Sequence, residues 1–133
     1  MSRLLVGTDG TAASERMLDY LDGNVDGDDT VYIVNSLKGG DETSSDDISE
    51  GDEAIEILEE GLEGTATVES HQYIRGNAPI EDLLAAGEEF EIDEYIIGVR
   101  KRSPVGKMMF GSTAQNLLLE TDLPVRCIPL VSE

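Results

Sequence analysis

The stretch Tyr95-Ile96-Ile97-Gly98-Val99 predicts a central β-strand that is buried on both faces. Its side chains are apolar or aromatic throughout, without the polar alternation of a strand that has one face in water. A loop follows, and the segment Ser112–Glu120, with Leu117 and Leu118 as its apolar positions, predicts a helix. This strand, loop and helix form one unit of an α/β protein.

The rest of the chain repeats this unit. Apolar, β-branched runs that predict strands alternate with helical spacings of apolar residues, and the whole chain reads β-α-β-α-β-α-β-α-β. The remaining strands are expected at 4–7, 31–34, 67–74 and 125–131, with helices beginning near 13, 55 and 79. Such alternation predicts a three-layer α/β fold, an open parallel five-stranded sheet with helices on both faces.

Two of these strands are expected at the edges of the sheet, although the last strand could instead have a break in its hydrogen-bond ladder. The run Thr67–Ile74 is the weakest in apolar residues, and the last strand contains Pro129, which has no N–H to donate to a neighbouring strand. Residues 41–63 hold eleven acids and no base, which predicts a mobile loop followed by a short helix. Asn77 and Pro79 predict the start of the next helix, with Glu81 and Asp82 in its first turn. Its core-facing positions are Ile80, Leu83 and Leu84.

Length and composition predict the number of domains, the kind of core and the compartment of the protein. A chain of 133 residues corresponds to one domain, residues 1–133, and 39% hydrophobic residues with no Trp predict a core of Ile, Leu, Val and Ala. The lone Cys127 cannot form an intrachain disulfide, and the sequence shows neither a signal peptide nor an apolar run long enough for a membrane span. We therefore expect a cytoplasmic protein that does not enter a membrane.

The net charge of −20 indicates adaptation to high salt. The chain has 29 acids against 9 bases, and in dilute buffer their repulsion would oppose the compact state. Concentrated salt shortens the Debye length to about 3 Å at 1 M, so distant like charges no longer repel one another. The acids are spread along the chain, which favours an extreme halophile with an acidic proteome over a protein with one acidic binding tail.

Four of the nine bases lie in one segment, residues 98–112, which contains no acid. The segment carries +4 and the rest of the chain −24. It ends where Gly111-Ser112-Thr113 begins a helix, and the first N–H groups of a helix are unpaired and attract anions. We therefore expect a site for a small anion here. The alternative is a set of surface ion pairs, which would contribute little in high salt.

Residues 98–112 also carry a resemblance that extends over the whole chain. The first strand ends in Asp9 before a helix of small residues, the fourth strand runs into Gly98, and Gly111-Ser112 follows at a fixed spacing. In these features the sequence resembles the universal stress protein family, whose glycine pattern is Gly, two residues, Gly, nine residues, then Gly and Ser or Thr. Here Lys101 stands at the second glycine.

The resemblance implies a fold, a ligand and a partner. The fold is adenine nucleotide alpha hydrolase-like, with strand order 3-2-1-4-5, and the ligand is ATP with Mg²⁺, held with adenine at the end of the second strand, ribose near Asp9 and phosphates on the glycine loop. The nucleotide-binding residues carried over are Thr8, Asp9, Ser36, Ile97, Gly98, Arg100, Lys101, Gly111, Ser112 and Thr113. The family also implies a homodimer through the last strand, at Val125, Cys127, Ile128 and Leu130.

Other chemistries are disfavoured by the residues themselves. The resemblance places His71 and Cys127 on opposite edge strands, so they cannot form a catalytic pair. The acids of residues 41–63 have no metal-binding spacing, Gly106-Lys107 lacks the Ser or Thr of a Walker loop, and nucleic-acid binding through four phosphate contacts would fail in high salt. We expect no catalytic residues and no metal ligands, although slow ATP hydrolysis stays open.

Two hypotheses for function follow. In the first, a universal stress protein binds a nucleotide or another small anion at the Gly98–Ser112 loop and acts in a stress response without catalytic turnover. In the second, it is a stress-response module that acts through protein contacts without a nucleotide. Lys101 separates them, because its Cβ could block the phosphate cradle or its ammonium could contact a phosphate.

Overall fold

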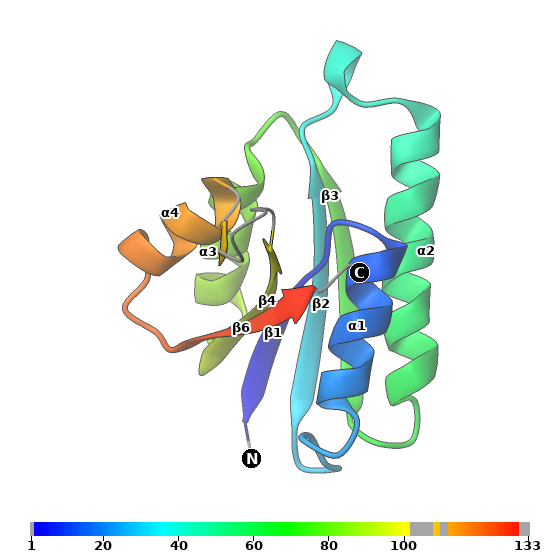
Figure 1. Cartoon of the computed structure of the whole chain (residues 1–133), viewed down its shortest axis with the longest axis vertical. Helices are drawn as coiled ribbons and strands as arrows, with labels where there is room; N and C mark the ends of the chain where they lie inside the picture. The colour runs from blue at the N-terminus through cyan, green and yellow to red at the C-terminus, as the bar shows by residue number, and fades with distance from the viewer. Residues whose placement is uncertain (1, 102–107, 110–111, 131–133) are drawn as a thin grey trace.

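The computed structural model describes residues 2–101, 108–109 and 112–130, and within them it forms a three-layer α/β fold. Figure 1 shows α1 and α2 on one side of the sheet and α3 and α4 on the other. The elements in chain order are β1 (Arg3–Gly7), α1 (Thr11–Leu21), β2 (Thr30–Leu37), the 3₁₀ turn η1 (Gly40–Glu42), α2 (Ser45–Leu62), β3 (Thr67–Ile74), α3 (Pro79–Glu89), β4 (Glu94–Lys101), β5 (Met108–Met109), α4 (Ser112–Glu120) and β6 (Val125–Leu130).

Five parallel strands form the sheet in the order β3-β2-β1-β4-β6, which confirms the predicted order 3-2-1-4-5. The two-residue strand β5 was not predicted and pairs antiparallel with the end of β4. Because Arg100 already pairs with Leu130 of β6, β5 lies on the other side of β4, beyond the end of β1. Within the described residues, β3 and β6 are the edges of the parallel sheet, as predicted.

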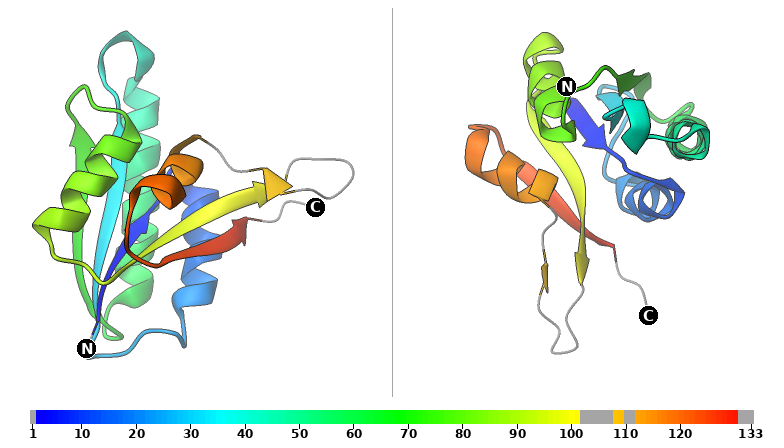
Figure 2. Two further views of the ribbon diagram at one scale, coloured as in Figure 1. Left: turned by 90° about the vertical axis from the view of Figure 1, so that its left-hand side faces the viewer. Right: turned by 90° about the horizontal axis from the view of Figure 1, so that it is seen from above.

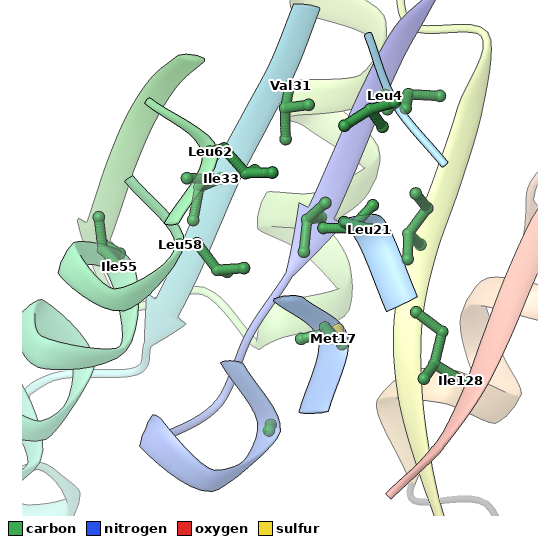
Figure 3. Close-up of a cluster of buried hydrophobic side chains, with 13 residues drawn as sticks. Leu4, Met17, Leu21, Val31, Ile33, Ile55, Leu58, Leu62 and Ile128 are labelled. Atoms are coloured by element: carbon green, nitrogen blue, oxygen red, sulfur yellow. The ribbon is translucent and has the colours of Figure 1, made fainter. Parts of the chain in front are cut away.

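Two apolar clusters, one on each face of the sheet, make up the core. The cluster under α1 and α2 includes Met17, Leu58 and Ile96, and Figure 3 shows its side chains converging from both helices onto the sheet. The cluster under α3 and α4 includes Leu83 and Leu117. Most members are Ile, Leu, Val or Ala, as the composition predicts.

The helix predicted late in residues 41–63, with Ile55, Leu58 and Leu62 toward the core, is present, but the predicted loop before it and its short length were wrong. Helix α2 has 18 residues, and it begins at a capping box: Ser44 Oγ accepts from the Asp47 N–H (3.1 Å), and the Asp47 carboxylate accepts from the Ser44 N–H (2.9 Å). Asp46 and Asp47 then lie in the first turn, where the helix dipole favours negative charge. These acids start the helix and do not belong to a loop.

The start of α3 was predicted at the right place. Pro79 is the first helical residue and Ala78 is the N-cap. Asn77 does not cap the helix, because its amide donates to the Asp82 carboxylate (3.1 Å). Leu83 is buried and Ile80 and Leu84 pack against the core, as predicted.

Candidate functional site

The carboxyl ends of β1, β2 and β4 meet at one edge of the sheet. Gly7 of β1 is in register with Val34 of β2 and with Ile97 of β4, so the turn after β1 begins between the ends of its two neighbours. Strand order reverses between β1 and β4, since the chain builds outward from β1 to β3 and then returns to place β4 on the other side. Open α/β sheets bind ligands at such a switch point.

The turn from β1 to α1 is held by buried polar contacts. Thr8 is 5% exposed, its N–H donates to the Val34 carbonyl (3.0 Å), and its hydroxyl lies 2.6 Å from Ser14 Oγ. Ser14 in turn donates to the Ala54 carbonyl of α2 (2.8 Å). The side chain of Asp9, next along the turn, is exposed. The predicted residues Thr8 and Asp9 therefore lie at the switch point, Thr8 as part of the frame and Asp9 on the surface.

A carboxylate from α2 caps the start of α1. Glu50 Oε2 accepts from the Thr11 N–H (2.8 Å) and from the Thr11 hydroxyl (3.0 Å). The first turn of α1 is thus already in contact with a negative charge of the protein itself. A phosphate placed there would meet Glu50 at close range, so this helix start does not suit a second anion.

Ser36 lies at the end of β2, as predicted, but its hydroxyl is already engaged by a carboxylate of α3. It donates to the Asp82 carboxylate of α3 (2.5 Å), which also accepts from Arg75 Nε (2.9 Å) and from the Asn77 amide. Asp82 is completely buried. Burial alone would raise the pKa of Asp82, but the hydrogen bonds from Ser36, Asn77 and Arg75 outweigh it, so the pKa lies below its usual range.

Gly98 has a packing role that the sequence did not reveal, whereas Ile97 is buried in the core, as the apolar run predicts. A Cβ at Gly98 would lie 2.5 Å from Leu130 Cδ1, so the side chain of Leu130 fills the space that this glycine leaves. Ile97 is 5% exposed and belongs to the core cluster under α3 and α4. The pairing of β1 with β4 ends at Gly7 and Ile97, and β4 continues beyond it. At this point Ile97 and Gly98 present only backbone groups to the edge of the sheet.

The remaining predicted site residues are only partly described. Arg100 and Lys101 end β4 and pair with Met109 and Met108 of β5, but their side chains lie outside the described residues. The same holds for the side chain of Ser112, the first residue of α4, and for Gly111 as a whole. Thr113 is half-buried in the first turn of α4. The proposed role of Lys101 thus stays a prediction.

The last strand contributes two side chains to the chain's own core. Ile128 is 4% exposed in the cluster under α1, and Leu130 packs over Gly98. Leu130 is half-buried, and the predicted homodimer through the last strand stays a prediction. Burial raises the pKa of the Cys127 thiol. His71 lies on β3, at the opposite edge of the sheet from Cys127, as predicted.

Sequence reasoning missed three polar residues around the site: Asn35, Glu50 and Asp82. Asn35 is 2% exposed, and the signal for it was a polar residue that directly follows the apolar run of β2. Nothing in the local sequence distinguishes Glu50 or Asp82 from the many exposed acids.

Within the described part of the chain, no helix is long and apolar enough to cross a membrane.

The strand order and the helices on both faces define an adenine nucleotide alpha hydrolase-like α/β fold. The family model for the universal stress protein family matches residues 1–129, and the chain belongs to that family, which confirms the resemblance seen in the sequence.

Known relatives agree with this assignment. A universal stress protein from Mycolicibacterium smegmatis is 46% identical over 48 residues, which span 36% of this chain and 37% of that protein. The structure of a universal stress protein from Archaeoglobus fulgidus is 34% identical with a TM-score of 0.74, and the match covers 96% of this chain and 98% of that one. A structure of the universal stress protein from the same organism in complex with dAMP is 29% identical, with a TM-score of 0.67 and the same coverage.

Proposed function

We propose that this chain binds an adenine nucleotide at the switch point between β1 and β4 and acts in a stress response as a nucleotide-binding module without catalytic turnover. The observation that carries the proposal is the meeting of three strand ends at this edge, with the exposed Asp9 between them. The similarity over 96% of the chain to a protein in complex with dAMP supports the ligand class.

The charges around the edge suggest how the nucleotide is oriented. Glu50 already occupies the start of α1, so the phosphates are better placed at the other end of the site, toward the start of α4. The sequence supplies bases there, since Arg100 and Lys101 end β4 and Arg102 and Lys107 follow in the chain before α4. Ribose then lies near Asp9, whose carboxylate can accept a hydrogen bond from a sugar hydroxyl.

Adenine is assigned to the backbone at the end of β2. The Ser36 hydroxyl already donates to Asp82, so a base at this point would meet main-chain N–H and C=O groups and not the serine side chain. We further propose ATP with Mg²⁺ as the form bound in the cell, a cytoplasmic location, a hypersaline setting and a homodimer through the edge of β6.

A second candidate is a module that acts through protein contacts without a nucleotide. The specific observation in its favour is a groove of about 380 Å³ between α1 and β6, beside the sheet edge. It is lined by Arg16, Asp19, Tyr20, Arg126, Cys127, Ile128 and Pro129. Arg16 Nε of α1 donates to the Pro129 carbonyl of β6 (3.0 Å), so a hydrogen bond joins the two elements that line the groove.

Isothermal titration calorimetry in 2 M KCl distinguishes the two candidates. We expect wild-type protein to bind AMP, dAMP and ATP with Mg²⁺, and Asp9→Ala to weaken AMP binding about tenfold, the effect of losing roughly 1.4 kcal/mol. Asp19→Ala is the matched control, because it removes the same charge from an exposed position on α1 outside the proposed site. Absence of heat from all three ligands, with folding confirmed by circular dichroism, would leave only the protein-contact candidate.

Lys101→Gly then tests the phosphate end of the site. If the lysine contacts a phosphate, the variant loses affinity for ATP more than for AMP. If the lysine blocks the glycine cradle of the family, the variant gains affinity for ATP. An unchanged affinity for both ligands would remove Lys101 from the site.

A further inference from the structure

Two side-chain amides, the buried Asn35 and the half-buried Gln72, link α2 to the turn that carries Asp9. Asn35 Nδ2 donates to the Thr8 carbonyl (2.9 Å), and Asn35 Oδ1 accepts from Gln72 Nε2 (3.1 Å). Gln72 Nε2 also donates to the carbonyl of Ile48 in α2 (3.1 Å). The path therefore runs from α2 through β3 and β2 to the end of β1, and every buried side-chain polar atom in the described residues has a hydrogen-bond partner.

A glycine in α2 makes room for this path. A Cβ at Gly51 would lie 2.6 Å from Gln72 Nε2 and closer still to Asn35 Oδ1. Glycine inside a helix costs about 1 kcal/mol relative to alanine. Glycine at this turn of α2 therefore lowers helix stability but leaves the space that the two amides occupy.

The turn itself is held at several independent points. Asn35 binds the Thr8 carbonyl, the Thr8 hydroxyl contacts Ser14, and Glu50 binds the first amide of α1 at Thr11. The exposed Asp9 lies between these points. The carbonyl of Thr8, the N–H of Asp9 and the Cα of Asp9 belong to the same planar peptide group, so a hydrogen bond to that carbonyl fixes the plane from which the Asp9 side chain is carried. The contacts at Thr11 and Ser14 hold the chain after it.

We propose that Asn35 is a positioning residue of the nucleotide site, which holds the Asp9 carboxylate in place for the sugar through the Thr8–Asp9 peptide. The proposal rests on the nucleotide-binding function proposed above. Asn35 is buried and does not touch the ligand itself. Its contribution is to hold the turn in one conformation before the nucleotide arrives, which reduces the conformational entropy lost on binding.

Asn35→Asp separates positioning from packing, because the two side chains have the same shape. The carboxylate still accepts from Gln72, but it has no hydrogen to donate and faces the Thr8 carbonyl oxygen. We expect AMP affinity at pH 7.5 to fall about tenfold or more, since a buried acceptor loses its partner. Burial raises the pKa of a carboxyl group, and its protonated form can donate to the Thr8 carbonyl again.

The pH profile is therefore the decisive readout. The ratio of variant to wild-type affinity for AMP should rise as the pH is lowered from 8 to 5.5. Any effect of pH that arises from groups common to both proteins, such as the carboxylates of Asp9 and Glu50, cancels in this ratio. Asn35→Ala loses both hydrogen bonds and has no group to protonate, so its ratio should stay low at every pH. This variant also provides the test if Asn35→Asp does not fold.

Tyr95→Phe is the matched stability control. It removes one buried hydrogen bond, from the Tyr95 hydroxyl to the Leu83 carbonyl (3.1 Å), on the opposite face of the sheet. It should lower the melting temperature and leave the affinity for AMP unchanged.

The outcomes separate the two proposals. If wild-type protein binds no nucleotide, the proposed function fails and the ligand role of Asn35 fails with it. If wild-type protein binds AMP and both Asn35 variants bind it as tightly as wild-type protein, only the positioning role is overturned. The same conclusion follows if Tyr95→Phe weakens AMP binding as much as the Asn35 variants do. A low affinity that recovers with acid in Asn35→Asp alone supports it.

Discussion

Gly98→Ala tests whether this glycine is required for packing. The added Cβ would lie 2.5, 2.7 and 2.8 Å from Cδ1, Cγ and Cδ2 of Leu130. All three distances are too short for carbon atoms, so Leu130 must leave its place against Ile128 and the rest of the core cluster under α1. Overpacking of this kind costs about 1–3 kcal/mol. In a domain of this length that corresponds to a melting temperature about 4–12 °C lower.

A double-mutant cycle with Leu130→Ala isolates the contact. Leu130→Ala removes the atoms that the new Cβ would meet, at its own cost of about 1–3 kcal/mol for a partly buried leucine. In that background Gly98→Ala should be close to neutral, because alanine is the better residue in a strand by about 0.5 kcal/mol. The expected coupling energy between the two positions is therefore about 1–3 kcal/mol.

The four proteins are compared by urea unfolding in 2 M KCl, followed by circular dichroism. An equal cost of Gly98→Ala in both backgrounds would refute the packing argument, since it would show that Leu130 has no part in the effect. Titration of the double variant with AMP adds a second result. Retained affinity there indicates that the glycine serves the sheet, whereas lost affinity indicates that the ligand needs it as well.

Four further predictions concern stability. Gly87→Ala should destabilise the protein by about 1–3 kcal/mol in thermal unfolding, because its Cβ would overlap the Tyr95 hydroxyl oxygen. Glu50→Ala should cost about 0.5–1 kcal/mol by removing the cap of α1, and Glu53→Ala, an exposed acid one turn further along α2, is the control. The pKa of Asp82 is lower in the folded chain than the value of about 4 in the unfolded chain, so its contribution is complete above pH 4 and is lost as the pH falls through the folded value. Asp82→Asn should therefore show a shallower loss of stability in acid than wild-type protein. Finally, the free energy of unfolding should rise with KCl from 0.1 to 3 M, because the net charge is −20, and a fall over that range would contradict the salt-adaptation hypothesis.

Much of the fold could be predicted because its signals are local. Each parallel strand is an apolar run, Pro129 marks an edge, and Pro79 marks a helix start. Helix α2 was underestimated because its first half is acidic and contains Gly51, features that are also typical of loops. The structure shows that Gly51 is a point of close approach to the sheet, which depends on residues in β2 and β3.

The site was less predictable because its frame is made by contacts between residues far apart in the chain. Asn35 reaches the Thr8 carbonyl across 27 positions, Glu50 reaches Thr11 across 39, and Ser36 reaches Asp82 across 46. A family pattern indicates which residues contact a ligand, but not which residues keep those contact residues in place. The second group follows from the register of the strands and from the helices that cover each face of the sheet (Figure 2).

The carboxyl end of β2 shows why this register matters for the site. Asn35 faces α2 and binds the turn after β1, while the next residue, Ser36, faces α3 and binds Asp82. Because neighbouring residues of a strand point to opposite faces, a shift of one position would exchange the two and leave both polar groups against the wrong helices. Apolar burial alone could accept Val, Ile or Leu on either face at this point. The two polar bonds therefore select the register, at the strand end where we propose that adenine and ribose lie.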